Sequence, residues 1–208
     1  MPINNYITAS CTISKNVVYK NEEKVFENEG AAPVDFLLSL YQHLETKYPK
    51  FYKMDSLSKL GWLGAEIILA NEFAEGRYAP GEIGVVLSNA SASLNTDIKY
   101  YETAKDIASP ALFVYTLPNI VIGEICIRHH FKGEGAFFIM EKFDAEFIQQ
   151  YVANLINNNI LQACICGWVE LLGDQYKAVL FLVEKEPSKS PLLFTNETIN
   201  KIYQSENG

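Results

Sequence analysis

Apolar runs of strand length alternate with longer segments of helical periodicity along most of this chain. The continuous run E-I-G-V-V-L-S at Glu82–Ser88 indicates a strand buried on both faces, which is typical of a sheet covered by helices on either side. Similar runs occupy Ala136–Met140 and Gln162–Glu170, and a Gly-Asp turn at 173–174 joins the latter to Tyr176–Glu184. The pattern predicts an α/β layered domain: a mixed, largely parallel five-stranded sheet with helices on both faces.

Helices are expected between the strands. Apolar spacing of three and four residues predicts helices over Val34–Leu44, Met54–Phe73, Leu94–Ala104, Pro118–His130 and Asp144–Asn157. The Pro118 helix is apolar on every side, so we expect it to be buried all round.

The remaining segments are predicted to be irregular or short. Tyr6–Ile13 is expected to form a first strand and Lys15–Gly30 a surface excursion. Ala108–Thr116 is expected to be an extended, packed loop. Glu186–Pro191 is interpreted as a linker, and Thr198–Tyr203 as a short amphipathic segment.

Size and charge limit the functional classes. The 208 residues suffice for one domain with a substantial core. A net charge of −8, with Arg77 and Arg128 as the two arginines, argues against nucleic acid or an anionic membrane as a partner. We find no apolar window near the roughly 20 residues of a membrane span, and no secretion signal, so we expect a cytoplasmic protein.

The cysteines do not form a metal-binding or redox pattern. Cys11, Cys126, Cys164 and Cys166 contain no C-x-x-C pair, and the three histidines do not complete a zinc-like spacing. We interpret the cysteines as small buried apolar residues, and we expect no metal and no cofactor.

A more specific signal lies in the order of five segments. Ile83–Leu87 reads I-G-V-V-L, Pro110 lies in a later loop, and Asn119–Ile127 reads N-I-V-I-G-E-I-C-I. Two more segments follow along the chain: Lys132-Gly133, and Cys166–Glu170, which reads C-G-W-V-E. In this order the segments resemble the N-terminal half of β-ketoacyl synthases of the thiolase-like superfamily, over about residues 50–184. The resemblance implies a single ketosynthase N-terminal-like domain over 1–208, with the superfamily's C-terminal half absent.

The same resemblance implies that the catalytic residues are missing. It places the family's nucleophilic cysteine at Lys142, and neither Glu141 nor Phe143 is a cysteine. A lysine at a helix start would be protonated and disfavoured by the helix dipole, and it cannot replace a thiolate. The family also uses two histidines, or a histidine and an asparagine, from its C-terminal half, and no histidine follows residue 131 here.

A narrower resemblance concerns Ile127–Gly133. Its sequence, I-R-H-H-F-K-G, is similar to the I-R-H-G-L-R-G of chain length factors, which are ketosynthase-like subunits without the cysteine that pair with an active partner. Half-size members occur in clusters that make aryl polyene pigments, and the chain resembles these. The resemblance implies a heterodimer with an active ketosynthase, or a homodimer through the same edge.

Two groups of apolar residues are candidates for contact with that partner. Phe137, Phe138, Ile139 and Met140 form the strand that pairs across the dimer axis in the family; alternatively they form an ordinary buried strand. The loop residues that the resemblance places against the partner's acyl tunnel, where bulk limits chain length, are Leu112, Phe113, Tyr115 and Leu117. Each of these could instead be a core residue.

These observations predict a catalytically silent subunit of a fatty-acid or polyketide-type ketosynthase, with the acidic acyl carrier protein binding mainly to the partner. One alternative is residual 3-oxoacyl synthase or acyltransferase activity at Cys126, Cys164 or Lys142, although the apolar surroundings of the cysteines disfavour a thiolate. Another is a free-standing acyl-binding or interaction module.

Overall fold

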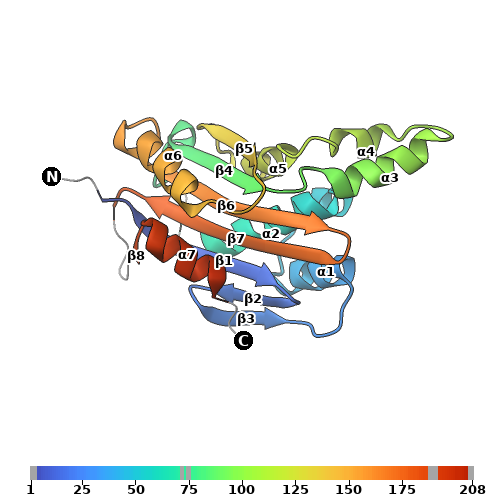
Figure 1. Cartoon of the computed structure of the whole chain (residues 1–208), viewed down its shortest axis with the longest axis horizontal. Coiled ribbons are helices and arrows are strands. Elements are labelled where there is room, and N and C mark those ends of the chain that lie inside the picture. Colours follow the sequence, from blue (N-terminus) through green and yellow to red (C-terminus); the bar gives the residue numbers. More distant parts are fainter. Residues whose placement is uncertain (1–3, 71–72, 74–75, 187–191, 206–208) are drawn as a thin grey trace.

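A single mixed sheet runs through the whole computed structural model, which describes residues 4–70, 73, 76–186 and 192–205 (Figure 1). Its strands follow the order β3-β2-β1-β7-β6-β4-β5, and β8 pairs with β1 beside that path. Their bounds are β1 Tyr6–Ser14, β2 Val17–Lys20, β3 Glu23–Glu27, β4 Ile83–Asn89, β5 Gly135–Ile139, β6 Ala163–Leu172, β7 Gln175–Glu184 and β8 Leu192–Leu193.

The mixed sheet is confirmed, but two details of the predicted sheet are wrong. The described part of the chain has eight strands rather than five, and pairing is parallel only where β4 meets β5 and β6. Two of the three additional strands, β2 and β3, come from 15–30, which was expected to be an irregular excursion, and the third is β8. Two-residue turns at Lys15-Asn16 and Asn21-Glu22 have positive φ at both residues, as type I′ hairpins require.

Helices cover both faces of the sheet, as predicted (Figure 1). One face packs against α1, α2 and α5, and the other against α6 and α7. The helix bounds are α1 Pro33–His43, α2 Ser56–Leu69, α3 Leu94–Ala104, α4 Pro110–Val114, α5 Ile120–His129, α6 Ala145–Asn157 and α7 Asn196–Gln204, with 3₁₀ turns at Pro49–Lys53 and Pro80–Glu82.

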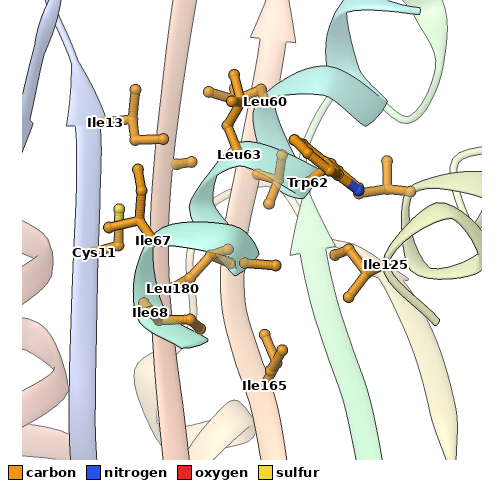
Figure 2. Close-up of a cluster of buried hydrophobic side chains, with 14 of the residues drawn as sticks. Cys11, Ile13, Leu60, Trp62, Leu63, Ile67, Ile68, Ile125, Ile165 and Leu180 are labelled. Carbon is orange, nitrogen blue, oxygen red and sulfur yellow. The ribbon is translucent and has the colours of Figure 1, made fainter. Parts of the chain in front are cut away.

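Helix α2 is the centre of the larger core, and Figure 2 shows its apolar side chains against the sheet. Its glycines allow close approach: a Cβ on Gly61 would lie 2.4 Å from Cγ1 of Val121 on α5, and one on Gly64 would lie 2.6 Å from Cδ1 of Leu180 on β7. Because α2 lies this close to both neighbours, it fixes α5 against the sheet.

Three further expectations need correction. Residues 108–116 contain α4 rather than an extended loop, because Pro110 occupies the first turn and Ser109 caps it by accepting from the amide of Leu112. Helix α5 is not buried all round, since Ile127 is 57% exposed. The predicted linker at Glu186–Pro191 lies outside the described residues except for Glu186, and the helix predicted to reach Phe73 ends at Leu69.

Candidate functional site: the junction of β5 and α6

Strand β5 brings the predicted nucleophile position to the carboxyl end of the parallel part of the sheet. It lies at the sheet edge and pairs with β4 in the register Leu87↔Phe137 and Asn89↔Ile139. One residue later, the amide of Met140 donates to the carbonyl oxygen of Asn89 at 2.8 Å. The chain then turns into α6, so the junction lies where open α/β sheets commonly place their ligand sites.

The junction presents a charged pair followed by a buried aromatic ring. Glu141 and Lys142 are exposed, whereas Phe143 is buried. The Phe143 ring stacks on Tyr203 of α7 with centroids 4.4 Å apart, and it meets Trp168 of β6 edge to face at 6.0 Å. Asp144 caps α6 by accepting from the amide of Phe147 at 2.9 Å. No thiol is present between β5 and α6.

The cysteines lie elsewhere and remain thiols. Cys11, Cys164 and Cys166 are fully buried, and burial raises the pKa of each thiol far above its usual value. Cys126 on α5 is half-buried, and desolvation raises its pKa too. Since the thiolate is the nucleophilic form, none of the four is activated for acyl transfer.

The histidines are not at the junction either. His129 and His130 end α5, beside the start of β4, because the amide of Lys132 donates to the carbonyl of Pro80 at 2.7 Å. They are therefore at the end of β4 opposite to the β5–α6 junction. His43 ends α1 and packs against the ring of Phe26. Within the described residues, no three potential ligands gather to hold a metal ion, and no helix is long and apolar enough to cross a membrane.

A half-buried glutamate, Glu170, fixes the loop that follows β4, near the junction. Glu170 Oε2 accepts hydrogen bonds from the amides of Ala90 (2.6 Å) and Ser91 (3.1 Å). Asn89 closes the same loop, since its side chain accepts from the amide of Ala92 and donates to the carbonyl of that residue. The glutamate that ends the C-G-W-V-E segment thus has a structural role in this chain.

The four predicted interface residues lie along the edge strand and just beyond it. Phe137 packs toward the face covered by α2 and α5, whereas Phe138 and Met140 pack toward the face covered by α6. The Phe138 ring contacts Phe147 and Tyr151 of α6 edge to face. Ile139 is 52% exposed, so the strand is not enclosed by the monomer.

The four predicted tunnel residues lie on α4 and the segment after it. Phe113 and Leu117 are more than half exposed and Leu112 is partly buried, so they are not core residues. The hydroxyl of Tyr115 donates to Oε1 of buried Glu124 at 3.0 Å; desolvation and this hydrogen bond raise the pKa of Tyr115. Because Lys50 Nζ lies 2.7 Å from the other oxygen of Glu124, the segment is tied to the body of the protein.

One apolar surface was missed in the sequence. Leu94, Ile98 and Tyr101 of α3 are all exposed, and in this helix only Thr96 is buried. Their spacing of four and three residues already predicts one stripe of the helix, but periodicity alone cannot say whether a stripe faces the core or solvent. Tyr100 on the adjacent side contacts Phe113, which joins α3 to α4.

The fold is similar to the folds of several solved structures. The chain is similar to the ishigamide ketosynthase/chain length factor (TM-score 0.65, 15% identity), covering 87% of this chain and 62% of that one. It is also similar to the ketosynthase ApeO in complex with its chain length factor ApeC from Xenorhabdus doucetiae (TM-score 0.60, 12% identity), covering 97% and 91%. A β-ketoacyl synthase from Burkholderia phymatum matches with a TM-score of 0.63 and 12% identity, over 89% of this chain and 60% of that one.

These matches confirm the resemblance at the level of fold. No protein-family model and no curated protein matches the sequence. The chain spans 62% of the length of the ishigamide relative and of the type II polyketide synthase relative AntDE:AntF.

Proposed function

We propose that this chain, which has the fold of ketosynthases and chain length factors, is a catalytically silent subunit that pairs with an active ketosynthase. The observation that carries the proposal is the β5–α6 junction. Glu141 and Lys142 are exposed there, and the buried Phe143 ring fills the space between α7 and β6. An acyl group transferred to this site would find no thiolate to accept it.

Pairing is supported by the open edge of β5. Just before β5 the carbonyl of Glu134 accepts from the amide of Val85, and six residues later, just beyond β5, the amide of Met140 donates to the carbonyl of Asn89. Since a parallel ladder uses every second residue of a strand, the amides of Phe137 and Ile139 point away from β4. An unpaired edge with an exposed isoleucine suits the addition of a strand from a second subunit.

The apolar stripe of α3 and the exposed residues of α4 support a partner surface larger than one strand. Leu94, Ile98 and Tyr101 would bury their exposed apolar area against a second chain, which is a favourable change. Phe113 and Leu117 then supply bulk at the contact. We propose that they limit the length of the acyl chain in the partner's tunnel, with Tyr115 holding the segment in place.

The comparison with the ApeO–ApeC complex supports a type of pathway, and the net charge of the chain supports a binding place for the acyl carrier protein. The match to the ApeO–ApeC complex extends over nearly all of both chains, so we propose an aryl polyene type of pathway and a location in the cytoplasm. With a net charge of −8, this subunit is a poor platform for an acidic acyl carrier protein, which would dock on the ketosynthase. In the absence of a partner, a homodimer through β5 would cover the edge.

The test is co-purification with a ketosynthase encoded in the same gene cluster. Ile139→Lys places a charge at the centre of the proposed contact, and we expect it to abolish co-purification while leaving the monomer folded, because the side chain is already half exposed. Val25→Lys is the matched control: it is a similar exposed β-branched residue on β3, at the opposite edge of the sheet. Loss of pairing in both variants, or in neither, would contradict pairing through β5.

A further inference from the structure

A cavity of about 720 Å³ opens on the face of the protein that carries α2 and α5. The end of α1, the last turns of α2, the end of α5 and the start of β4 enclose it. Because β4 is seven residues long, roughly 20 Å of strand separates this cavity from the β5–α6 junction. The cavity is thus independent of the proposed function.

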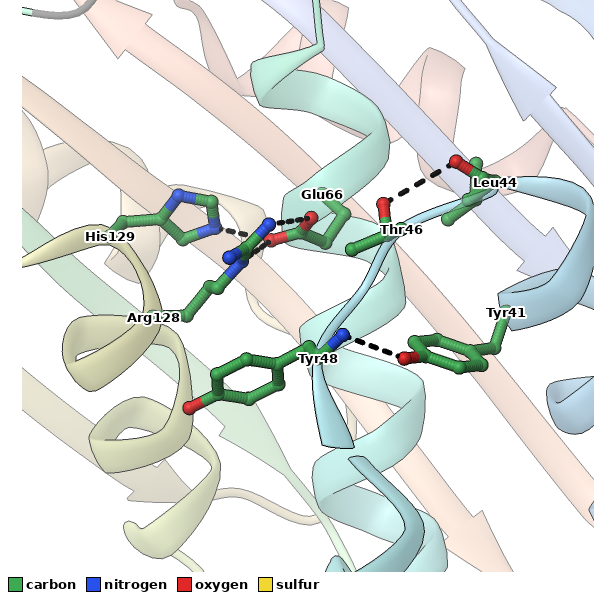
Figure 3. A network of polar contacts seen from close by, with 7 residues as sticks. All are labelled: Tyr41, Leu44, Thr46, Tyr48, Glu66, Arg128 and His129. Carbon is green, nitrogen blue, oxygen red and sulfur yellow. Dashed lines mark hydrogen bonds and ion pairs between the residues drawn. The ribbon is translucent and has the colours of Figure 1, made fainter. Parts of the chain in front are cut away.

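One wall of the cavity is a cluster of charged side chains (Figure 3). Glu66 of α2 accepts two hydrogen bonds from Arg128, from Nε at 3.1 Å and from Nη2 at 3.4 Å. His129 Nε2 lies 2.8 Å from Oε1 of the same carboxylate. Burial alone would raise the pKa of Glu66, but the contacts with His129 and Arg128 outweigh it and lower the pKa, so Glu66 is ionised at neutral pH.

Arg128 has N–H groups that can donate hydrogen bonds to a second anion. Its contacts with Glu66 use two of the five guanidinium N–H donors, and its side chain is 32% exposed. The guanidinium also lies over the Tyr48 ring, 5.2 Å from the centroid, which fixes its plane. Within the described residues, Glu66 is the acceptor that Arg128 contacts, and Arg128 is the one permanently charged cation that lines the cavity.

The rest of the cavity is apolar and aromatic. Leu44, Leu69 and Ile83 line it, together with Phe131 and Tyr78. The Phe131 ring stacks on His129 with centroids 5.3 Å apart, so the apolar surface continues directly into the charged wall. A volume of this size, mainly apolar with a few convergent polar groups, is typical of small-molecule sites.

We propose that this cavity binds a small carboxylate that has an apolar or aromatic body. The carboxylate accepts hydrogen bonds from the free N–H groups of Arg128, and the body lies on Leu69, Ile83 and Phe131, beside the ring of His129. The charge of the cluster selects the class of ligand. Glu66 cancels the charge of Arg128, so the permanent charges of the cavity wall sum to zero, and this suits a monoanion rather than a phosphate carrying two charges.

The test uses 3-phenylpropanoate as the probe, with binding measured by isothermal titration calorimetry and by NMR shifts of the Arg128 and His129 side-chain N–H groups. Glu66→Gln keeps the shape and the hydrogen-bond acceptor but removes the competing negative charge. We expect it to tighten binding by about fivefold or more, as for one charge-assisted contact. The double variant Glu66→Gln/Arg128→Gln removes both charges without leaving either unpaired, and we expect it to weaken binding roughly tenfold relative to Glu66→Gln.

Two controls separate this site from general charge effects. Lys99→Gln removes an exposed positive charge from α3 and should leave affinity unchanged. The uncharged 3-phenylpropan-1-ol should bind about tenfold more weakly than the carboxylate. Equal affinity for the alcohol and the carboxylate, weaker binding in Glu66→Gln, or NMR shifts that avoid Arg128 and His129 would each overturn the proposal. Since neither partner pairing nor the β5 edge enters this experiment, its outcome is separate from that of the proposed function.

Discussion

At the scale of single residues, the surroundings of each cysteine determine whether its thiol can ionise and act as a nucleophile. Three cysteines are fully buried, and desolvation by the apolar core raises their pKa values, so they remain protonated at neutral pH. Cys126 is the most accessible of the four, but its pKa is raised in the same direction. Lys142 at the junction is exposed to water and is not enclosed in an apolar pocket.

We therefore expect no acyl adduct when the purified chain is incubated with a malonyl or acyl thioester probe at neutral pH and examined by intact mass spectrometry. An active ketosynthase treated in the same way is the positive control. If a cysteine is labelled, peptide mapping and the corresponding Cys→Ser variant identify it. Stoichiometric labelling of one cysteine in the folded chain would revive the alternative of a residual acyltransferase.

At the scale of elements, the packing of α2 against α5 determines where the polar groups of both helices lie. The approach is possible because Gly61 has no side chain at the contact with Val121. Val121 is fully buried and β-branched, so it cannot move aside by changing rotamer. Glu66, five residues further along α2, meets Arg128 on α5 because this contact sets the distance between the helices.

Gly61→Ala should therefore destabilise the protein by roughly 1–3 kcal/mol, even though alanine is the better helix former, because the new methyl group overpacks the contact. Gly123→Ala in α5 is the matched control, since a Cβ there would meet nothing within 4 Å. We expect that variant to be more stable by about 0.5–1 kcal/mol. Urea denaturation followed by circular dichroism measures both. A stable Gly61→Ala variant would show that the helices can separate without cost.

Some elements and contacts of the fold could be predicted from the sequence, and others could not. Strand β4 and helices α3 and α6 were predicted within one or two residues, because continuous apolar runs, regular apolar spacing and the Asp144 cap are local signals. The β1–β2–β3 hairpins were missed, since their turns use Lys15-Asn16 and Asn21-Glu22 rather than a glycine pair. The exposed position of α3 and the Glu66–Arg128 contact depend on tertiary packing, and local spacing does not encode them.

At the scale of the whole molecule, the strands form one sheet that has β3 at one end of the strand order and β5 at the other. The β5 end carries the junction and the candidate partner strand, and the neighbouring α3 and α4 carry exposed apolar residues (Figure 1). The molecule as a whole is acidic, with 25 acidic side chains against 17 lysines and arginines. Its long-range field therefore repels acidic partners and leaves association to apolar contact.

From this charge we expect that an acyl carrier protein will not bind to the chain alone but will bind to its complex with a ketosynthase. Surface plasmon resonance with immobilised carrier protein, at about 0.05 M and 0.15 M salt, measures both cases, because electrostatic docking weakens as salt screens it. Micromolar, salt-sensitive binding by the isolated chain would contradict the prediction. The chain with Ile139→Lys, mixed with the ketosynthase, is the control for indirect binding.

The open margin of β5 has a consequence for the life of the protein in a cell. A newly made copy exposes backbone donors and acceptors until another polypeptide covers them, and such a copy is a substrate for proteases and a seed for precipitation. Under the proposed pairing through β5, the number of surviving copies is governed by how many partner subunits are synthesised nearby and at the same time, so balanced translation of the two subunits would matter as much as their affinity.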